Sequence, residues 1–454
     1  MKQTPDKVDE LKRRIQEGRI ELGAIHNTIS SQMAGYETLA RSFYTPNRYI
    51  VDMLDIEPAK VAIINDVTGI TRSWPLFTKE AQIPYFMHGS NGPNCLVDLM
   101  DEPVFYWISP DNDLKNKTLC RTDSYYSPNK VLNWNQKGVN KLIKRHVDLD
   151  WEYDCILAYD SHDFSIPTLD NAENIREWNS KYAYPNIRCS TISSFFDDVD
   201  RQADHSKIHE TTKDAPDSWD DQDATDAELL AKARKVNYEI PTAEKYSTIA
   251  MALAGGYPEK LIFQAYNRII MYHEHTNGAI SGVDHQYYET ERKMHRTLVT
   301  EAIDYSKKAL GSSLGKICSM IKTSSDALVV YNPLSWTRDE IVYIDKLEMP
   351  AENFNLYDNK TNEQVKLQKL NNGKIAFYAK EIPSLGYKTY RFEETTKPSY
   401  QQSIPSEETT IENKFYKITI DYDKNIIADI YDKQLNVTIL DPDFPYSLGG
   451  IHSL

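Results

Sequence analysis

Three aspartates in the first half of the chain stand where a pair of carboxylates could act together. Asp66 directly follows the apolar run 61–65, and Asp160 and Asp163 follow the apolar run 155–159. In a parallel α/β sheet or barrel, residues just beyond the carboxyl ends of the strands face the ligand. Two carboxylates there suit glycoside hydrolysis, in which one attacks or stabilises the anomeric carbon and the other protonates the leaving oxygen. Each aspartate, taken singly, is also the favoured N-cap residue where a strand turns into a helix.

The sequence His273-Glu274-His275 lies at the end of a helix predicted to start near Pro258. Histidine is the commonest metal ligand, but residues two apart on a regular helix face different ways, so His273 and His275 are not expected to bind one ion together. The spacing also differs from HExxH, the zinc motif of metalloproteases. One of the two histidines could complete a metal site whose other ligands are the carboxylates of the α/β region. The alternative is that both are helix C-terminal residues favoured by the macrodipole.

Motifs for other chemistry are absent from the sequence. No phosphate-binding loop or GxGxxG follows a strand, and no GxSxG is present, so nucleotide-binding and serine-hydrolase hypotheses lack their motifs. Gly89-Ser-Asn-Gly-Pro-Asn94 follows an expected strand at residues 84–87. It is either a polar loop at the same face as the aspartates or an ordinary turn.

The elements that must position these residues alternate between helices and short apolar strands. Thr4 and Pro5 predict the start of a helix that Gly18 closes. Further helices are expected at residues 139–146 and 171–181, and strands at residues 20–25, 61–64, 84–87 and 155–159. Continuously apolar strands between helices indicate a parallel sheet covered on both faces, as an open sheet or a barrel.

An acidic stretch near residues 200–225 marks a domain boundary, after which the pattern becomes helical. Thr225 and Glu228 predict a capping box, and the helical pattern continues at residues 242–254, 258–272 and 284–310, which indicates a small helical bundle. Strands are then expected at residues 327–331, 340–344, 374–378, 387–392, 415–420 and 426–431. We therefore expect a partial catalytic α/β barrel over residues 1–212, a helical bundle over 213–325, a small β domain over 326–396 and the start of a β-sandwich over 405–454.

Composition narrows the possible partners. Because 67 Asp and Glu outnumber 52 Lys and Arg, the net charge is −15, which argues against binding the phosphates of a nucleic acid. No apolar run reaches the 18 or so residues that a membrane span needs. The N-terminal residues 1–14 are charged and lack the apolar part of a signal peptide, so the expected location is cytoplasmic, or periplasmic or secreted if the true start lies upstream.

Several segments, in their order and spacing, resemble glycoside hydrolase family 38, a family of α-mannosidases. They are Glu17-Gly-Arg-Ile-Glu-Leu-Gly23, Gly35-Tyr-Glu-Thr-Leu-Ala-Arg41, Asn65-Asp66-Val-Thr-Gly69, His162-Asp163-Phe164, Glu274-His275-Thr276, Tyr331-Asn-Pro-Leu-Ser-Trp336 and Ile382-Pro-Ser-Leu-Gly-Tyr387. The resemblance implies a partial seven-stranded β/α barrel, a helical bundle and β-sandwich domains. It also implies retaining hydrolysis of α-mannosides with one zinc ion. By position, Asp66 is the nucleophile and a zinc ligand, Asp163 the general acid and base, and His275 a second zinc ligand.

The sequence also departs from the family. Two further zinc ligands are expected from a His-x-Asp pair on an early strand, and no such pair precedes Gly35. The chain also ends near the start of the family's large C-terminal β-sandwich, so truncation at both ends is expected. A catalytic zinc usually has three protein ligands, and only Asp66 and His275 can be named. His26 or His88 could substitute, without support from their spacing.

These departures leave other hypotheses open. Asn277 stands where the family usually has an aromatic residue and His162 where an acidic one is common, so contacts to the sugar are expected to differ. One alternative is a non-catalytic carbohydrate-binding protein or an inactive fragment that cannot hold the metal. Another is a hydrolase of similar architecture that acts on a different glycoside.

Overall fold

The computed structural model divides into two compact units, Met1–Ile321 and Lys322–Leu454. Both helices and sheets are present, so the predicted mixed α/β class is confirmed. The structure describes residues 7–91, 104–111, 117–124, 135–159, 169–216, 218–219, 224–276, 285–323, 326–398, 400–402, 409–441, 444 and 447–449. The finer domain boundaries expected near residues 212 and 396 stay predictions.

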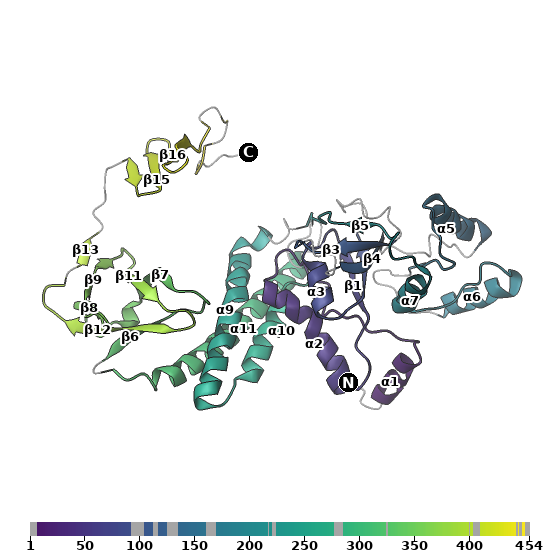
Figure 1. The fold of residues 1–454 in the computed structure, drawn as a ribbon, viewed down its shortest axis with the longest axis horizontal. Helices are drawn as coiled ribbons and strands as arrows, with labels where there is room; N and C mark the ends of the chain where they lie inside the picture. Colours follow the sequence, from purple (N-terminus) through teal and green to yellow (C-terminus); the bar gives the residue numbers. More distant parts are fainter. Residues whose placement is uncertain are drawn as a thin grey trace. The chain divides into compact units, whose positions relative to one another are not determined.

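A five-stranded sheet lies in the first unit (Figure 1). Its strands are β1 (Val61–Val67), β2 (Tyr85–Ser90), β3 (Phe105–Ile108), β4 (Lys117–Ser124) and β5 (Glu210–Thr211). The spatial order is β1-β2-β4-β3-β5: β1 and β2 are parallel as predicted, and β4, which was not predicted, is parallel to β2 and antiparallel to β3. The connection between β3 and β4 is short and consists of residues 109–116. A parallel crossover needs a dozen residues or more, so this connection permits only antiparallel pairing.

Two expected strands are not formed. Residues 20–25 and 155–159 belong to no β-ladder, although both segments contact β1. The Ala24 amide donates to the Val61 carbonyl at 2.9 Å, and the Tyr159 hydroxyl donates to Asn65 Oδ1 at 2.7 Å. Alternate side chains of the second segment, including Leu157, pack against the core. Burial of these side chains therefore explains the apolar pattern without backbone pairing.

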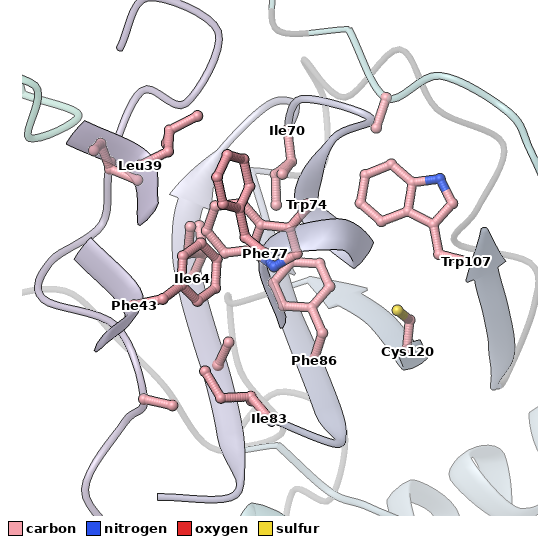
Figure 2. Packing of buried hydrophobic residues seen from close by; sticks show 14 of the residues in the cluster. Leu39, Phe43, Ile64, Ile70, Trp74, Phe77, Ile83, Phe86, Trp107 and Cys120 are labelled. Atoms are coloured by element: carbon pink, nitrogen blue, oxygen red, sulfur yellow. The ribbon is translucent and has the colours of Figure 1, made fainter. Parts of the chain in front are cut away.

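Apolar side chains cover both faces of the sheet, as predicted. Figure 2 shows one face, where Phe43 and Trp74 gather with Phe86 of β2. The rings of Phe43 and Trp74 meet edge to face with their centroids 4.6 Å apart. On the other face, Phe196 stacks on Tyr85 of β2 with centroids 4.9 Å apart. The helices of this region are α1 (Val8–Gln16), α2 (Tyr36–Leu54), α3 (Trp74–Glu80), α5 (Gln136–Asp148), α6 (Asp170–Lys181) and α7 (Ile192–Gln202).

The predicted start of the first helix lies partly outside the described residues. Thr4 and Pro5 are not described, and the described helix α1 begins at Val8. Gly18, just beyond its end, has φ +69°, a left-handed conformation that glycine adopts without steric cost. The predicted C-terminal stop is therefore confirmed.

Three long helices, α9 (Ala227–Ala254), α10 (Glu259–Tyr272) and α11 (His285–Cys318), pack along one another after the short turn η3 (Ala224–Asp226) (Figure 1). Two segments expected as separate helices are one helix, because α9 continues through Pro241. Ile240 and Ala243 beside it are fully buried, and this packing outweighs the roughly 3 kcal/mol that a helical proline costs. Among the described residues, no helix combines the length and apolarity that a membrane crossing requires.

The predicted capping box of Thr225 and Glu228 is wrong. Helix α9 begins at Ala227, so its N-cap residue is Asp226 rather than Thr225, and the Asp226 side chain makes no capping hydrogen bond. The carboxylate of Asp226 instead accepts from Arg292 of α11 at 2.9 Å. A salt bridge to another helix thus takes the place of a local cap.

The second unit contains three four-stranded sheets, with orders β13-β10-β11-β7, β6-β12-β8-β9 and β14-β15-β16-β17. The first two share one buried core, to which Phe377 and Tyr390 contribute from β11 and β12. All six predicted strands are confirmed, with ends shifted by a few residues. The strands are β6 (Ala327–Tyr331), β7 (Arg338–Ile344), β8 (Phe354–Asp358), β9 (Gln364–Val365), β10 (Leu367–Lys369), β11 (Ile375–Ile382), β12 (Tyr387–Glu394), β13 (Tyr400–Gln402), β14 (Thr410–Glu412), β15 (Tyr416–Asp421), β16 (Ile426–Asp432) and β17 (Val437–Thr438), with a short helix η4 (Lys346–Glu348).

Replacing Phe43 by Ala should destabilise the first unit by about 3–5 kcal/mol, because it leaves a cavity beside Trp74. Tyr49→Ala is the matched control: Tyr49 lies on the same helix and is 46% exposed, so its loss should cost within about 0.5 kcal/mol. Urea unfolding followed by tryptophan fluorescence measures both changes. Equal effects of the two variants would contradict a packed core at Phe43.

Asp358 should stabilise the second unit in a pH-dependent way. Burial raises the pKa of Asp358, but the hydrogen bonds from Lys388, at 2.6 Å, and from the Lys360 amide outweigh burial and lower it. Since the folded pKa is lowered, the stabilisation is present above the unfolded pKa of about 3.9 and is lost as the pH falls through the folded pKa.

The Asp358→Asn variant tests this expectation. At pH 7 it should lose roughly 1–3 kcal/mol of protection against amide exchange in β8 and β12, because Lys388 is left half-buried without its carboxylate. The deficit should shrink as the pH falls below the unfolded pKa of about 3.9 and towards the lowered folded pKa, where native Asp358 also becomes protonated. A deficit that does not change with pH over this range would show that the ion pair does not contribute.

Candidate active site

Asp66 lies within the last residues of β1 rather than after the strand. The pairing of β1 with β2 passes from Asn65 opposite Gly89 to Val67 opposite Ser90, so Asp66 is left out of the ladder as a bulge. Its φ is +61°, in the left-handed region that Asp tolerates better than most residues. A bulge at the end of a strand redirects a side chain.

His275 is placed by a turn that is no longer helical. Helix α10 ends at Tyr272, and the following residues pair with the segment that precedes β1 through a bridge between Ile29 and Glu274. The Ser30 amide donates to the His273 carbonyl at 2.8 Å, and the His275 amide donates to the Thr28 carbonyl at 2.9 Å. Two segments far apart in the sequence are thereby held in register.

This register brings His275 to Asp66 across 209 residues of sequence, with His275 Nε2 3.2 Å from Asp66 Oδ2. The carboxylate of Glu274 forms an ion pair with His275 Nδ1 on the other side of the ring. Burial alone would lower the pKa of His275, but the two carboxylates outweigh it and raise the pKa to about 9. The other oxygen of Asp66, Oδ1, accepts from Asn91 Nδ2 at 2.8 Å.

His273 points elsewhere. It is 1% exposed, and its Nε2 accepts from Asn237 Nδ2 at 3.0 Å. Burial lowers the pKa of His273 to about 3, so the ring is neutral at pH 7. A neutral ring gains nothing from a helix macrodipole, so the alternative that both histidines are C-terminal cations is wrong for His273.

The second carboxylate position lies outside the described residues. Asp160, His162 and Asp163 are not described, and neither is Asn277. The segment that leads into them is held at β1 by the hydrogen bond from Tyr159 to Asn65. Tyr159, the last described residue before this gap, therefore lies next to the strand that carries Asp66.

Neither proposed substitute ligand joins the site through a described contact. His88 is buried and donates from Nε2 to the Val67 carbonyl at 3.1 Å, and burial lowers its pKa to about 4. His26 Nε2 faces Asn267 Nδ2 at 3.4 Å. Within the part of the chain that the structure describes, no group of three His, Cys, Asp or Glu side chains could hold a metal ion.

Asp66 and His275 nevertheless match zinc in their donor chemistry. A carboxylate oxygen and an imidazole nitrogen are both zinc donors, and they face each other. The ring nitrogen of His275 remote from Asp66 lies against a carboxylate, as is usual for histidines that bind metals. The described residues therefore supply two donors of the right kind.

Sequence reasoning missed several residues of this site. Asn91 lies in segment 89–94, for which a polar loop at the face of the aspartates and an ordinary turn were the two interpretations, and its hydrogen bond to Asp66 favours the polar loop. Asn65 stands in the segment that carries Asp66, but no role was predicted for it or for Tyr159. Thr28 and Ser30 contribute through backbone atoms, which the residue type does not reveal.

A comparison with protein families agrees with the resemblance seen in the sequence. Residues 1–222 match the model of the glycosyl hydrolases family 38 N-terminal domain. No curated protein sequence matches the chain.

Solved structures share the fold over nearly the whole chain. An alpha-mannosidase from Enterococcus faecalis V583 superposes with a TM-score of 0.73 at 14% identity, covering 96% of this chain and 54% of that one. A protein in the glycosyl hydrolase family 38 from Enterococcus faecalis superposes with a TM-score of 0.69 at 15% identity, covering 96% of this chain and 52% of the other. The present chain thus spans about half the length of these proteins.

The hydrogen bond between Tyr159 and Asn65 should hold the segment before Asp163 against β1. Tyr159→Phe, which removes only the hydroxyl, should cost about 1 kcal/mol of stability. In an Asn65→Ala background the same change should cost less, and a double-mutant cycle of urea unfolding isolates the coupling. Additive effects of the two changes would mean that the contact contributes nothing.

Proposed function

We propose that this chain carries the catalytic site of a retaining α-mannosidase. The observation that carries the proposal is the contact of Asp66 with His275, because it joins the end of β1 to the end of α10 at one polar site. The family 38 domain over residues 1–222 supports glycoside hydrolysis, and the similarity to an α-mannosidase structure supports the choice of sugar. We further propose that the five-stranded sheet is part of a partial seven-stranded β/α barrel.

In this proposal Asp66 is the nucleophile. A retaining glycosidase needs one ionised carboxylate aimed at the anomeric carbon, and both oxygens of Asp66 are oriented by neighbours, Asn91 at one and His275 at the other. Such contacts to the ionised form keep a carboxylate charged and hold its direction. Asp163 is the general acid, which protonates the leaving oxygen and then, as a base, activates water.

Asp66 and His275 would also hold a zinc ion, since they offer donors that zinc takes. When bound, zinc would contact hydroxyls of the sugar and favour a ring shape nearer the transition state. A third protein donor would have to come from residues other than those the structure describes, or from another chain. Glu274, paired with His275 Nδ1, leaves Nε2 directed at the site.

The two aspartates should respond differently to the leaving group. Asp66→Ala should lower turnover by at least about a thousandfold with every α-mannoside, because no glycosyl–enzyme bond can form. Asp163→Ala should retain much of the rate of the first chemical step with dinitrophenyl α-mannoside, because that leaving group needs no proton. With methyl α-mannoside, whose leaving group needs one, the variant should lose that rate. Steady-state and burst kinetics on both substrates measure the difference.

Asp170→Asn, at an exposed carboxylate at the start of α6, is the matched control and should change neither rate. If Asp66→Ala turned over as the native chain does, the nucleophile assignment would be wrong. If the native chain neither turned over an α-mannoside nor bound zinc, the alternative of a non-catalytic protein would replace this proposal.

A further inference from the structure

A buried chain of polar side chains runs from α2 through α9 to the end of α10. The Thr38 hydroxyl on α2 donates to Asn237 Oδ1 at 2.7 Å, and Asn237 Nδ2 donates to His273 Nε2 at 3.0 Å. Thr38, Asn237 and His273 are all 5% exposed or less. Buried polar groups that are joined in this way have few alternative partners, so the three side chains fix one another.

The start of α2 also holds Asn237 by contact. A Cβ added at Gly35 would lie 2.7 Å from Asn237 Cβ, which is closer than carbon atoms can approach without a shift. Only glycine lets α2 come this near to α9. The amide of Asn237 is therefore confined both by its two hydrogen bonds and by the backbone of Gly35.

His273 links Asn237 to the turn that carries His275. Its ring is bound to Asn237, while its carbonyl accepts from Ser30, in the segment that pairs with the turn carrying His275. Two residues later, His275 reaches Asp66. We propose that Asn237 is a positioning residue: acting through His273, it fixes the turn that presents His275 to Asp66. The effect of Asn237 on zinc binding rests on the proposed function, in which His275 is a zinc ligand.

The test compares Asn237→Ala with Ser247→Ala. Ser247 is a buried residue of the same helix whose hydroxyl is hydrogen-bonded to Ser313 of α11 at 2.9 Å, so its loss removes a buried contact of the bundle without touching His273. Hydrogen–deuterium exchange of residues 273–276 should accelerate in Asn237→Ala and stay unchanged in Ser247→Ala. This readout needs neither metal nor activity.

Zinc affinity gives the second readout. Zinc alone, titrated against a chromophoric chelator, should bind Asn237→Ala about 10–100-fold more weakly than the native chain, as is typical when the support of a ligand is lost. Ser247→Ala should bind like the native chain, and His275→Ala should show the full loss. Thr38→Val keeps the hydrogen bond between Asn237 and His273, so its exchange rate and zinc affinity should lie between those of the native chain and Asn237→Ala. If Asn237→Ala does not fold, Thr38→Val replaces it in both measurements.

The outcomes separate this inference from the proposed function. If exchange accelerates in Asn237→Ala but the native chain binds no zinc, the positioning role stands and the metal assignment fails. If the native chain binds zinc through His275, yet Asn237→Ala and Thr38→Val match Ser247→Ala in exchange and affinity, the positioning role is overturned.

Discussion

The site depends on the short antiparallel contact between residues 28–30 and 273–275. The segment that makes it is itself attached to the sheet, because the Ala24 amide donates to the Val61 carbonyl at the start of β1. One stretch of backbone therefore touches both the strand that carries Asp66 and the turn that carries His275. Without that contact, nothing in the local structure of β1 or α10 would bring the two side chains within 3.2 Å of each other.

The three histidines near this contact differ in their protonation. His88 and His273 are buried and have lowered pKa values, so both rings are neutral at pH 7. His275 is the opposite case, because two carboxylates raise its pKa to about 9. Asp66 lies at Nε2 of the His275 ring and Glu274 at Nδ1, so each ring nitrogen faces one carboxylate. Burial therefore lowers the pKa of His88 and of His273, whereas the two carboxylates outweigh burial at His275.

The sheet carries Asp66, and the helical bundle leads into the turn that carries His275. An aromatic core around Trp74 and Phe86 packs on the sheet that contains β1 and β2, and the neighbours of the bulged Asp66 stay paired (Figure 2). The hydrogen bonds from Thr38 through Asn237 to His273 tie the end of α10 to two other helices. Sites placed on rigid elements in this way keep their geometry to a fraction of an ångström.

The sequence by itself determined strands β1 and β2, the helical bundle and the β character of the second unit, and it placed Asp66 and His275 near the ends of a strand and a helix. Apolar runs and helical spacing carry that information locally. Tertiary structure alone decided that residues 20–25 and 155–159 are not strands, that α9 continues through Pro241, and that Asn91 bonds to Asp66 and Asn237 to His273. Those outcomes rest on hydrogen bonds and packing between distant segments, many made by backbone atoms that every residue type possesses.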